Sequence, residues 1–110
     1  ALAAVPGQES EFRDALARAL EYADATGCPR LHCLAGHSDD PAAEATFVAN
    51  LNRAATDVDR YGVRLMLEPL NTRDNPGYFL TGSTQARRII DQSLSDITCL
   101  GSAGTTIGIE

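Results

Sequence analysis

The stretch Val63-Arg64-Leu65-Met66-Leu67-Glu68-Pro69-Leu70-Asn71 decides the fold class of this chain. Its first five residues are mostly apolar on both faces, which is typical of a parallel strand with helices packed over it. A helix is predicted directly before the strand: it begins at Pro41, a residue type favoured in the first helical position, and Gly62 ends it. Its predicted buried stripe consists of Phe47, Leu51, Ala54, Ala55 and Val58. A helix followed at once by such a strand indicates an α/β fold.

The same alternation of helix and strand continues in both directions from this stretch. The further elements predicted are helices at residues 10–25 and 83–92 and strands at residues 31–35 and 97–100. Ser10 is the predicted N-cap of the first helix and Gly27 its C-terminal stop. Strands that alternate with helices imply right-handed parallel crossovers, in either a doubly wound sheet or a barrel.

Composition narrows the classes of partner. The formal net charge is −6 and the chain has no lysine, which argues against a nucleic-acid surface. No apolar run approaches the ~20 residues that span a bilayer, so no membrane contact is expected. No Gly-x-Gly-x-x-Gly or Walker loop is present, and no nucleotide cofactor is expected. The three cysteines (Cys28, Cys33 and Cys99) form no C-x-x-C pair, which favours buried, reduced thiols and a cytoplasmic protein.

Glu68 is the candidate catalytic or metal-binding residue. The ends of parallel strands carry the ligand sites of α/β folds, and Glu68 follows the predicted strand directly. A carboxylate there can move a proton or hold a hard cation. The alternative is a structural acid that caps the next loop or pairs with Arg64 or Arg73.

The loop after Glu68 is longer than the 2–6 residues of most strand-to-helix loops, which favours a function for it. Tyr78 in this loop either lines a site or packs on the core.

Of the two histidines, His32 is predicted within a strand, opposite Leu31 and Cys33, and faces either a barrel interior or the helices. A hydrogen-bonded core position is the favoured interpretation for it. His37 follows the strand and is predicted as an exposed loop residue with a candidate role in ligand contact.

The segment Leu67-Glu68-Pro69-Leu70-Asn71-Thr72-Arg73-Asp74-Asn75-Pro76-Gly77-Tyr78-Phe79-Leu80 resembles the strand-end motif of the hydroxypyruvate isomerase family, within the xylose-isomerase-like barrels. Residues 2–13 and 27–36 are similar to the preceding part of the same enzymes, and the resemblance runs to about Asp91. It implies a (β/α)₈ barrel and the interconversion of hydroxypyruvate and tartronate semialdehyde through an enediol.

The resemblance also implies roles for individual residues. Glu68 matches the first of two family glutamates that flank the substrate, beside a divalent metal such as Mg²⁺ or Mn²⁺, so it is expected to be both a catalytic residue and a metal ligand. Asn71 and Tyr78 match positions near the mouth and, with His37, are the predicted substrate-binding residues.

The family pattern is not recognisable after Asp91, where a strand that ends in Asp and is followed by His is expected. Such barrels run to about 250 residues. We therefore expect a fragment: residues 1–92 a partial barrel, and residues 93–110 a divergent tail with one further strand. This piece of a longer protein, without the second glutamate, is expected to be inactive on its own.

Two alternatives stay open. One is a keto-sugar or sugar-acid isomerase or epimerase of the same superfamily, so that the expected partner is a small keto acid or sugar. The other is a non-catalytic α/β remnant that forms homo-oligomers through unpaired sheet edges.

Overall fold

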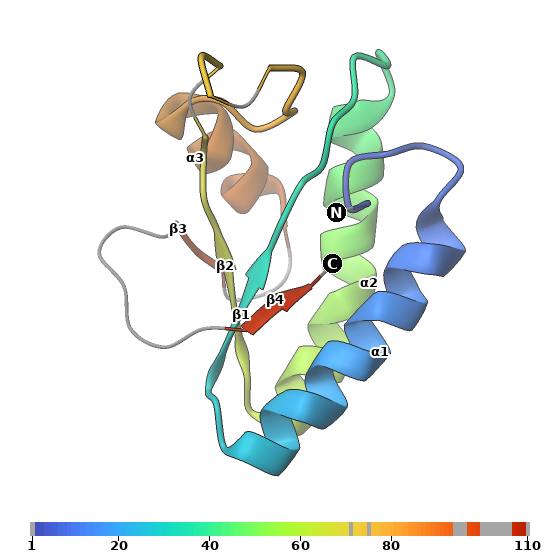
Figure 1. The fold of residues 1–110 in the computed structure, drawn as a ribbon, viewed down its shortest axis with the longest axis vertical. Coiled ribbons are helices and arrows are strands. Elements are labelled where there is room, and N and C mark those ends of the chain that lie inside the picture. Colours follow the sequence, from blue (N-terminus) through green and yellow to red (C-terminus); the bar gives the residue numbers. More distant parts are fainter. Residues whose placement is uncertain (1, 71, 75, 94–96, 100–106, 110) are drawn as a thin grey trace.

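Helices and parallel strands alternate along the chain as the sequence predicts. The structure is a computed structural model, and it describes residues 2–70, 72–74, 76–93, 97–99 and 107–109. Its elements are α1 (Glu9–Thr26), β1 (Arg30–Cys33), α2 (Ala43–Tyr61), β2 (Arg64–Leu67), α3 (Ser83–Gln92), β3 (Ile97–Cys99) and β4 (Ile107–Ile109) (Figure 1). The predicted α/β class is confirmed, and the predicted third helix has the observed bounds.

All four described strands lie in one parallel sheet with the order β3-β2-β1-β4. Neighbouring β1 and β2 pair from Arg30 opposite Arg64 to His32 opposite Met66. Because consecutive strands β1, β2 and β3 are neighbours, this part of the sheet has the strand order of a barrel wall.

Strand β4 departs from barrel order. It pairs with the far edge of β1, where Ile107 lies opposite Leu31 and Ile109 opposite Cys33. In a barrel that edge belongs to the strand that precedes β1. The tail therefore contributes two strands where the sequence predicted one, and the predicted Leu100 at the end of β3 lies outside the described residues. The division of the chain at residue 92 stays a prediction.

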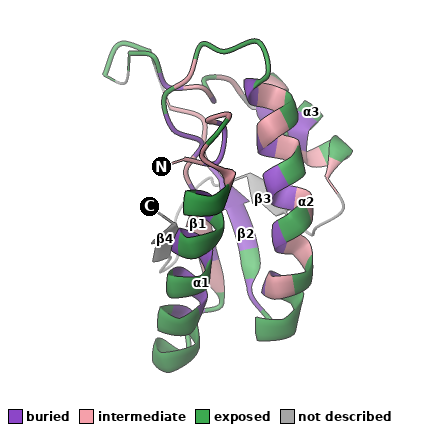
Figure 2. Cartoon of the chain, turned by 90° about the vertical axis from the view of Figure 1, so that its right-hand side faces the viewer, coloured by how far each residue is buried: buried purple, intermediate pink, exposed green. Residues whose placement is uncertain are grey.

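The core lies between the sheet and the three helices. Leu31 and Cys33 on β1 and Leu65 and Leu67 on β2 are fully buried against the helices. In Figure 2, α2 turns its buried residues toward the strands and its exposed residues away from them. The helices contribute Phe12, Leu16, Ala19, Leu20 and Ala23 from α1, Phe47, Leu51, Ala54 and Val58 from α2, and Ala86 and Ile89 from α3. The residues of α2 in this list are those of its predicted apolar stripe, apart from the partly buried Ala55.

The predicted helix ends are correct and two predicted starts are wrong. Gly27 and Gly62 end α1 and α2 in the left-handed conformation, with φ values of 71° and 66° that glycine adopts without steric cost. Ser10 is not the N-cap of α1, because the amide of Phe12 already donates to the carbonyl of Gln8 at 3.0 Å and starts the helical pattern earlier.

Pro41 is not the first residue of α2. Asp40 forms a turn in front of the helix: its Oδ1 accepts a hydrogen bond from the amide of Ala42 at 2.8 Å, and its carbonyl accepts one from the amide of Ala43 at 3.0 Å. Side chains of this kind compete with helix formation at its start, so α2 begins at Ala43.

Asn50 ties the N-terminal segment to the ends of the strands. This residue is 1% exposed, and its Nδ2 donates to the carbonyl of Ala3 at 2.8 Å. The amide of Ala4 donates to the carbonyl of Ala35 just after β1, also at 2.8 Å. The opening residues therefore lie beside the exit of β1 and help to fix it.

Cys28 and Cys33 are buried and form no disulfide among the described residues, as predicted, whereas the side chain of Cys99 lies outside those residues. Burial raises the pKa of the Cys33 thiol to about 12.

In the part of the chain that the structure describes, no helix has the length and apolarity that a membrane crossing needs.

Candidate functional site

The carboxyl ends of β1 and β2 meet at one edge of the sheet, and Glu68 lies there. It is the first residue after Leu67, the last residue of β2, as the sequence predicted. Its side chain is 37% exposed, although the strand that leads to it is buried. A carboxylate is therefore held at the end of a rigid strand and stays accessible to a small molecule.

His32 is the nearest ionisable neighbour of Glu68. Its Nε2 lies 3.8 Å from Oε1 of Glu68, and the imidazole is 15% exposed. Leu31 and Cys33 point to the helices, so alternation along β1 directs His32 to the opposite face of the sheet. Burial lowers the pKa of His32, and the attraction of Glu68 opposes this only in part. A neutral imidazole therefore lies beside the carboxylate at neutral pH.

The prediction of a hydrogen-bonded core position for His32 is wrong in one respect, because its buried Nε2 has no hydrogen-bond partner among the residues that the structure describes. The barrel-interior alternative fits the face on which it lies. The predicted set of site residues did not include His32. The strand register identifies it as a site residue. His32 is opposite Met66 of β2, and Glu68 follows Met66 by two residues.

The loop after Glu68 folds back onto the exit of β1. Its two ends are joined where the amide of Leu70 donates to the carbonyl of Leu80 at 2.9 Å. The amide of Phe79 donates to the carbonyl of Gly36 at 2.8 Å, and the amide of Ser38 donates to the carbonyl of Gly77 at 3.2 Å. The two strand-end loops are thereby fixed against each other beside Glu68.

Tyr78 and His37 come together where these loops join. The Tyr78 side chain is 6% exposed, and its hydroxyl accepts a hydrogen bond from the buried amide of Ala35 at 3.0 Å. Burial raises the pKa of Tyr78, and Glu68 is close enough to raise it further. The His37 ring packs edge-on against Tyr78, with centroids 5.7 Å apart. Both residues flank the strand ends, and their role in substrate binding stays a prediction.

Asn71, the remaining predicted substrate-binding residue, lies outside the described residues. The neighbouring Thr72, Arg73 and Asp74 are exposed. Among the described residues, the Glu68 carboxylate lies beside His32 and forms no ion pair with an arginine.

The residues around Glu68 do not fit a divalent metal by themselves. Glu68 and His32 supply one carboxylate and one imidazole, and among the residues that the structure describes no three His, Cys, Asp or Glu side chains cluster to hold an ion. Mg²⁺ requires near-octahedral coordination, mostly by oxygen. The role of Glu68 as a metal ligand stays a prediction that needs ligands from outside this set.

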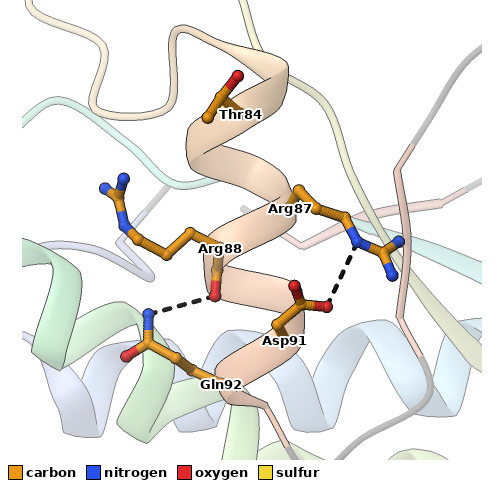
Figure 3. A pocket seen from close by; sticks show the side chains of 5 residues that line it. All are labelled: Thr84, Arg87, Arg88, Asp91 and Gln92. Carbon is orange, nitrogen blue, oxygen red and sulfur yellow. Dashed lines mark hydrogen bonds and ion pairs between the residues drawn. The ribbon is translucent and has the colours of Figure 1, made fainter.

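A hollow of about 740 Å³ lies along α3 (Figure 3). It is lined by Thr84, Arg87, Arg88, Asp91 and Gln92, all from this one helix. Its charges are already paired: Arg87 with Asp91 at 3.3 Å, and Arg88 with Glu44 of α2 through two hydrogen bonds. The Arg88–Glu44 pair joins α3 to α2, and the described lining of the hollow includes no residue from the end of β1 or β2.

Comparisons with known proteins agree with this geometry. A family model described as a xylose isomerase-like TIM barrel matches residues 1–96. The chain is 44% identical over 92 residues to a 2-oxo-tetronate isomerase of Cupriavidus necator and 39% identical over 102 residues to a hydroxypyruvate isomerase of Escherichia coli. These matches take in 80% and 89% of this chain but 35% and 38% of the two relatives.

A solved structure gives the same result in three dimensions. The crystal structure of AP endonuclease, family 2, from Brucella melitensis superposes with a TM-score of 0.85 at 35% sequence identity. The superposition covers 90% of this chain and 40% of that protein. The chain therefore spans little more than a third of the length of the curated relatives it matches, and it corresponds to one section of a barrel wall.

Proposed function

The chain belongs to the xylose isomerase-like TIM barrel family, and from this premise we propose that it is part of an isomerase of short 2-oxo acids. Two relatives are named for such compounds, hydroxypyruvate and 2-oxo-tetronate. Each compound has a hydroxyl group on the carbon next to its keto group. The observation that carries the proposal is Glu68, an exposed carboxylate at the end of β2.

The reaction needs a group that moves protons between neighbouring carbons. When the keto group migrates from C2 to C3, a proton leaves C3, an enediol forms, and a proton is added at C2. We assign Glu68 to the proton transfer at one of these carbons. A positioned acid or base of this kind contributes about 10²- to 10⁴-fold to the rate. His37, Asn71 and Tyr78 are the proposed substrate contacts around it.

The second proton-transferring group has no counterpart in the described part of this chain. The chain on its own is accordingly proposed to be inactive, and no step of the proposal runs through a metal. A small keto acid in the cytoplasm is the proposed partner, and the buried, reduced cysteines Cys28 and Cys33 support that compartment.

The second candidate substrate is 2-oxo-tetronate, the longer of the two acids. The match to the 2-oxo-tetronate isomerase, at 44% identity, favours a four-carbon sugar acid as the second candidate. Side chains that distinguish three carbons from four lie around the far end of the substrate, so the choice depends on the rest of the barrel.

A chimera tests the proposal. Residues 1–93 replace the matched segment of the E. coli hydroxypyruvate isomerase, and the purified chimera is assayed with hydroxypyruvate and with 2-oxo-tetronate. We expect isomerisation of at least one acid, and loss of at least about 100-fold in kcat on Glu68→Gln. The control Glu21→Gln, on the exposed face of α1, leaves kcat unchanged. A folded chimera that isomerises neither acid contradicts the proposed function.

A further inference from the structure

We propose that His32 is a positioning residue that orients the Glu68 carboxylate by donating a hydrogen bond from its Nε2. This inference rests on the proposed function, because it assigns a role within the same site. Nothing in the family names assigns a role to His32. The inference starts from the environment of His32, since its Nε2 is buried and has no hydrogen-bond partner within the described part of the chain.

The structure places the Glu68 carboxylate beside this nitrogen as an acceptor. Oε1 of Glu68 is 3.8 Å from Nε2, about 1 Å beyond a normal charge-assisted hydrogen bond. Glu68 is the first residue outside β2, and its three side-chain torsions allow the carboxylate to move over that distance. A rotation of the Glu68 side chain toward His32 would therefore give the buried Nε2 an acceptor.

His32 has the rigidity that a positioning residue needs. It lies in β1, which is paired with β2 on one side, opposite Met66, and with β4 on the other, opposite Gly108. The neighbours of His32 in the strand, Leu31 and Cys33, are fully buried on the helix side of the sheet. The imidazole is therefore fixed in place, whereas the carboxylate beside it stands at the start of a loop.

Direct contact of Nε2 with substrate does not fit the structure. The accessible area of this atom is below 1 Å², so a substrate molecule at the mouth cannot reach it. The Glu68 side chain is 37% exposed and does reach the mouth. His32 must then act on the reaction through Glu68. Its hydrogen bond would restrict the Glu68 carboxylate to the orientation in which it meets the substrate.

The contact is tested first on the 110-residue chain, without any activity. His32 and His37 are its only histidines, so their ring nitrogens are assigned in a long-range ¹H–¹⁵N spectrum by replacing each in turn. At pH 7.5 we expect Glu68→Gln to shift the Nε2 signal of His32, whereas the control Glu21→Gln leaves it in place. An unchanged Nε2 signal in the Glu68→Gln variant overturns the proposal.

The positioning role is tested in the chimera described above. His32→Leu removes the donor and is expected to lower kcat about 10- to 100-fold with little change in KM. His32→Asn supplies an amide donor and is expected to restore most of kcat. Equal kcat for His32→Leu and the unsubstituted chimera, or no recovery with Asn in folded protein, overturns the role. If the unsubstituted chimera has no activity, the proposed function fails, and the NMR result still decides the contact.

Discussion

Replacing Tyr78 by Phe removes a single oxygen from the join between the two strand-end loops. That hydroxyl accepts the hydrogen bond of the Ala35 amide at 3.0 Å, and both groups are buried. The ring itself remains in place, so the substitution leaves a donor without an acceptor and creates no large cavity. A buried polar group left in this state costs about 1–3 kcal/mol of unfolding free energy.

Thermal unfolding measured by circular dichroism detects a change of this size. For 110 residues an unfolding entropy of about 2.1 cal/mol/K per residue makes each kcal/mol equal to about 4 °C in Tm. Tyr78→Phe is therefore expected to lower Tm by about 4–13 °C. Tyr22→Phe is the matched control, because Tyr22 is 62% exposed and its loss is expected to shift Tm by no more than about 2 °C. Equal Tm values for the two variants would refute the assigned role of the Tyr78 hydroxyl.

Three further predictions follow from the same structure. The pKa of His32 is lowered by burial, so the unfolded chain binds more protons below about pH 6.5, and stability that is complete above this pH is lost as the pH falls toward the folded pKa. Urea unfolding at pH 7.5 and 5.5 should show this fall, and the same fall in His32→Asn would contradict it. Cys33, with its pKa raised to about 12, should react with iodoacetamide at pH 8 far more slowly in the folded than in the urea-unfolded chain; comparable rates by peptide mass spectrometry would contradict this. Deleting residues 107–110 unpairs the outer edge of β1 and should increase self-association in sedimentation velocity, whereas an unchanged sedimentation coefficient would show that β4 does not protect that edge.

The sequence predicts most of the fold because its signals are local. The apolar stripe of Phe47, Leu51 and Val58 requires a helix face and a covered sheet, and the left-handed turns at Gly27 and Gly62 are accessible mainly to glycine. Local competition explains the error at the start of α2, where the Asp40 side chain forms a turn that the residue pattern alone does not reveal. Pairing of β4 with β1 joins segments more than 70 residues apart, and no local pattern in a strand of three residues specifies it.

The candidate site divides in the same way. Glu68 was predictable, because an acid directly after an apolar strand lies at the carboxyl end of the sheet whatever the rest of the fold. His32 was not assigned to the site, because alternation shows that it is opposite Leu31 and Cys33 but not which face the helices cover. Only the placement of α1 and α2 over one face, together with the register of β1 and β2, directs His32 to Glu68.

Exchange of the C3 protons of hydroxypyruvate with solvent tests most directly whether Glu68 transfers a proton. The chimera is incubated with hydroxypyruvate in D₂O, and loss of the C3 proton signal is followed by NMR against enzyme-free and Glu21→Gln samples. We expect enzyme-dependent deuterium incorporation in the unsubstituted chimera and in Glu21→Gln, and a rate reduced by at least about 100-fold in Glu68→Gln. Incorporation at the unsubstituted rate in folded Glu68→Gln protein would contradict the assignment of Glu68 as the proton-transferring residue.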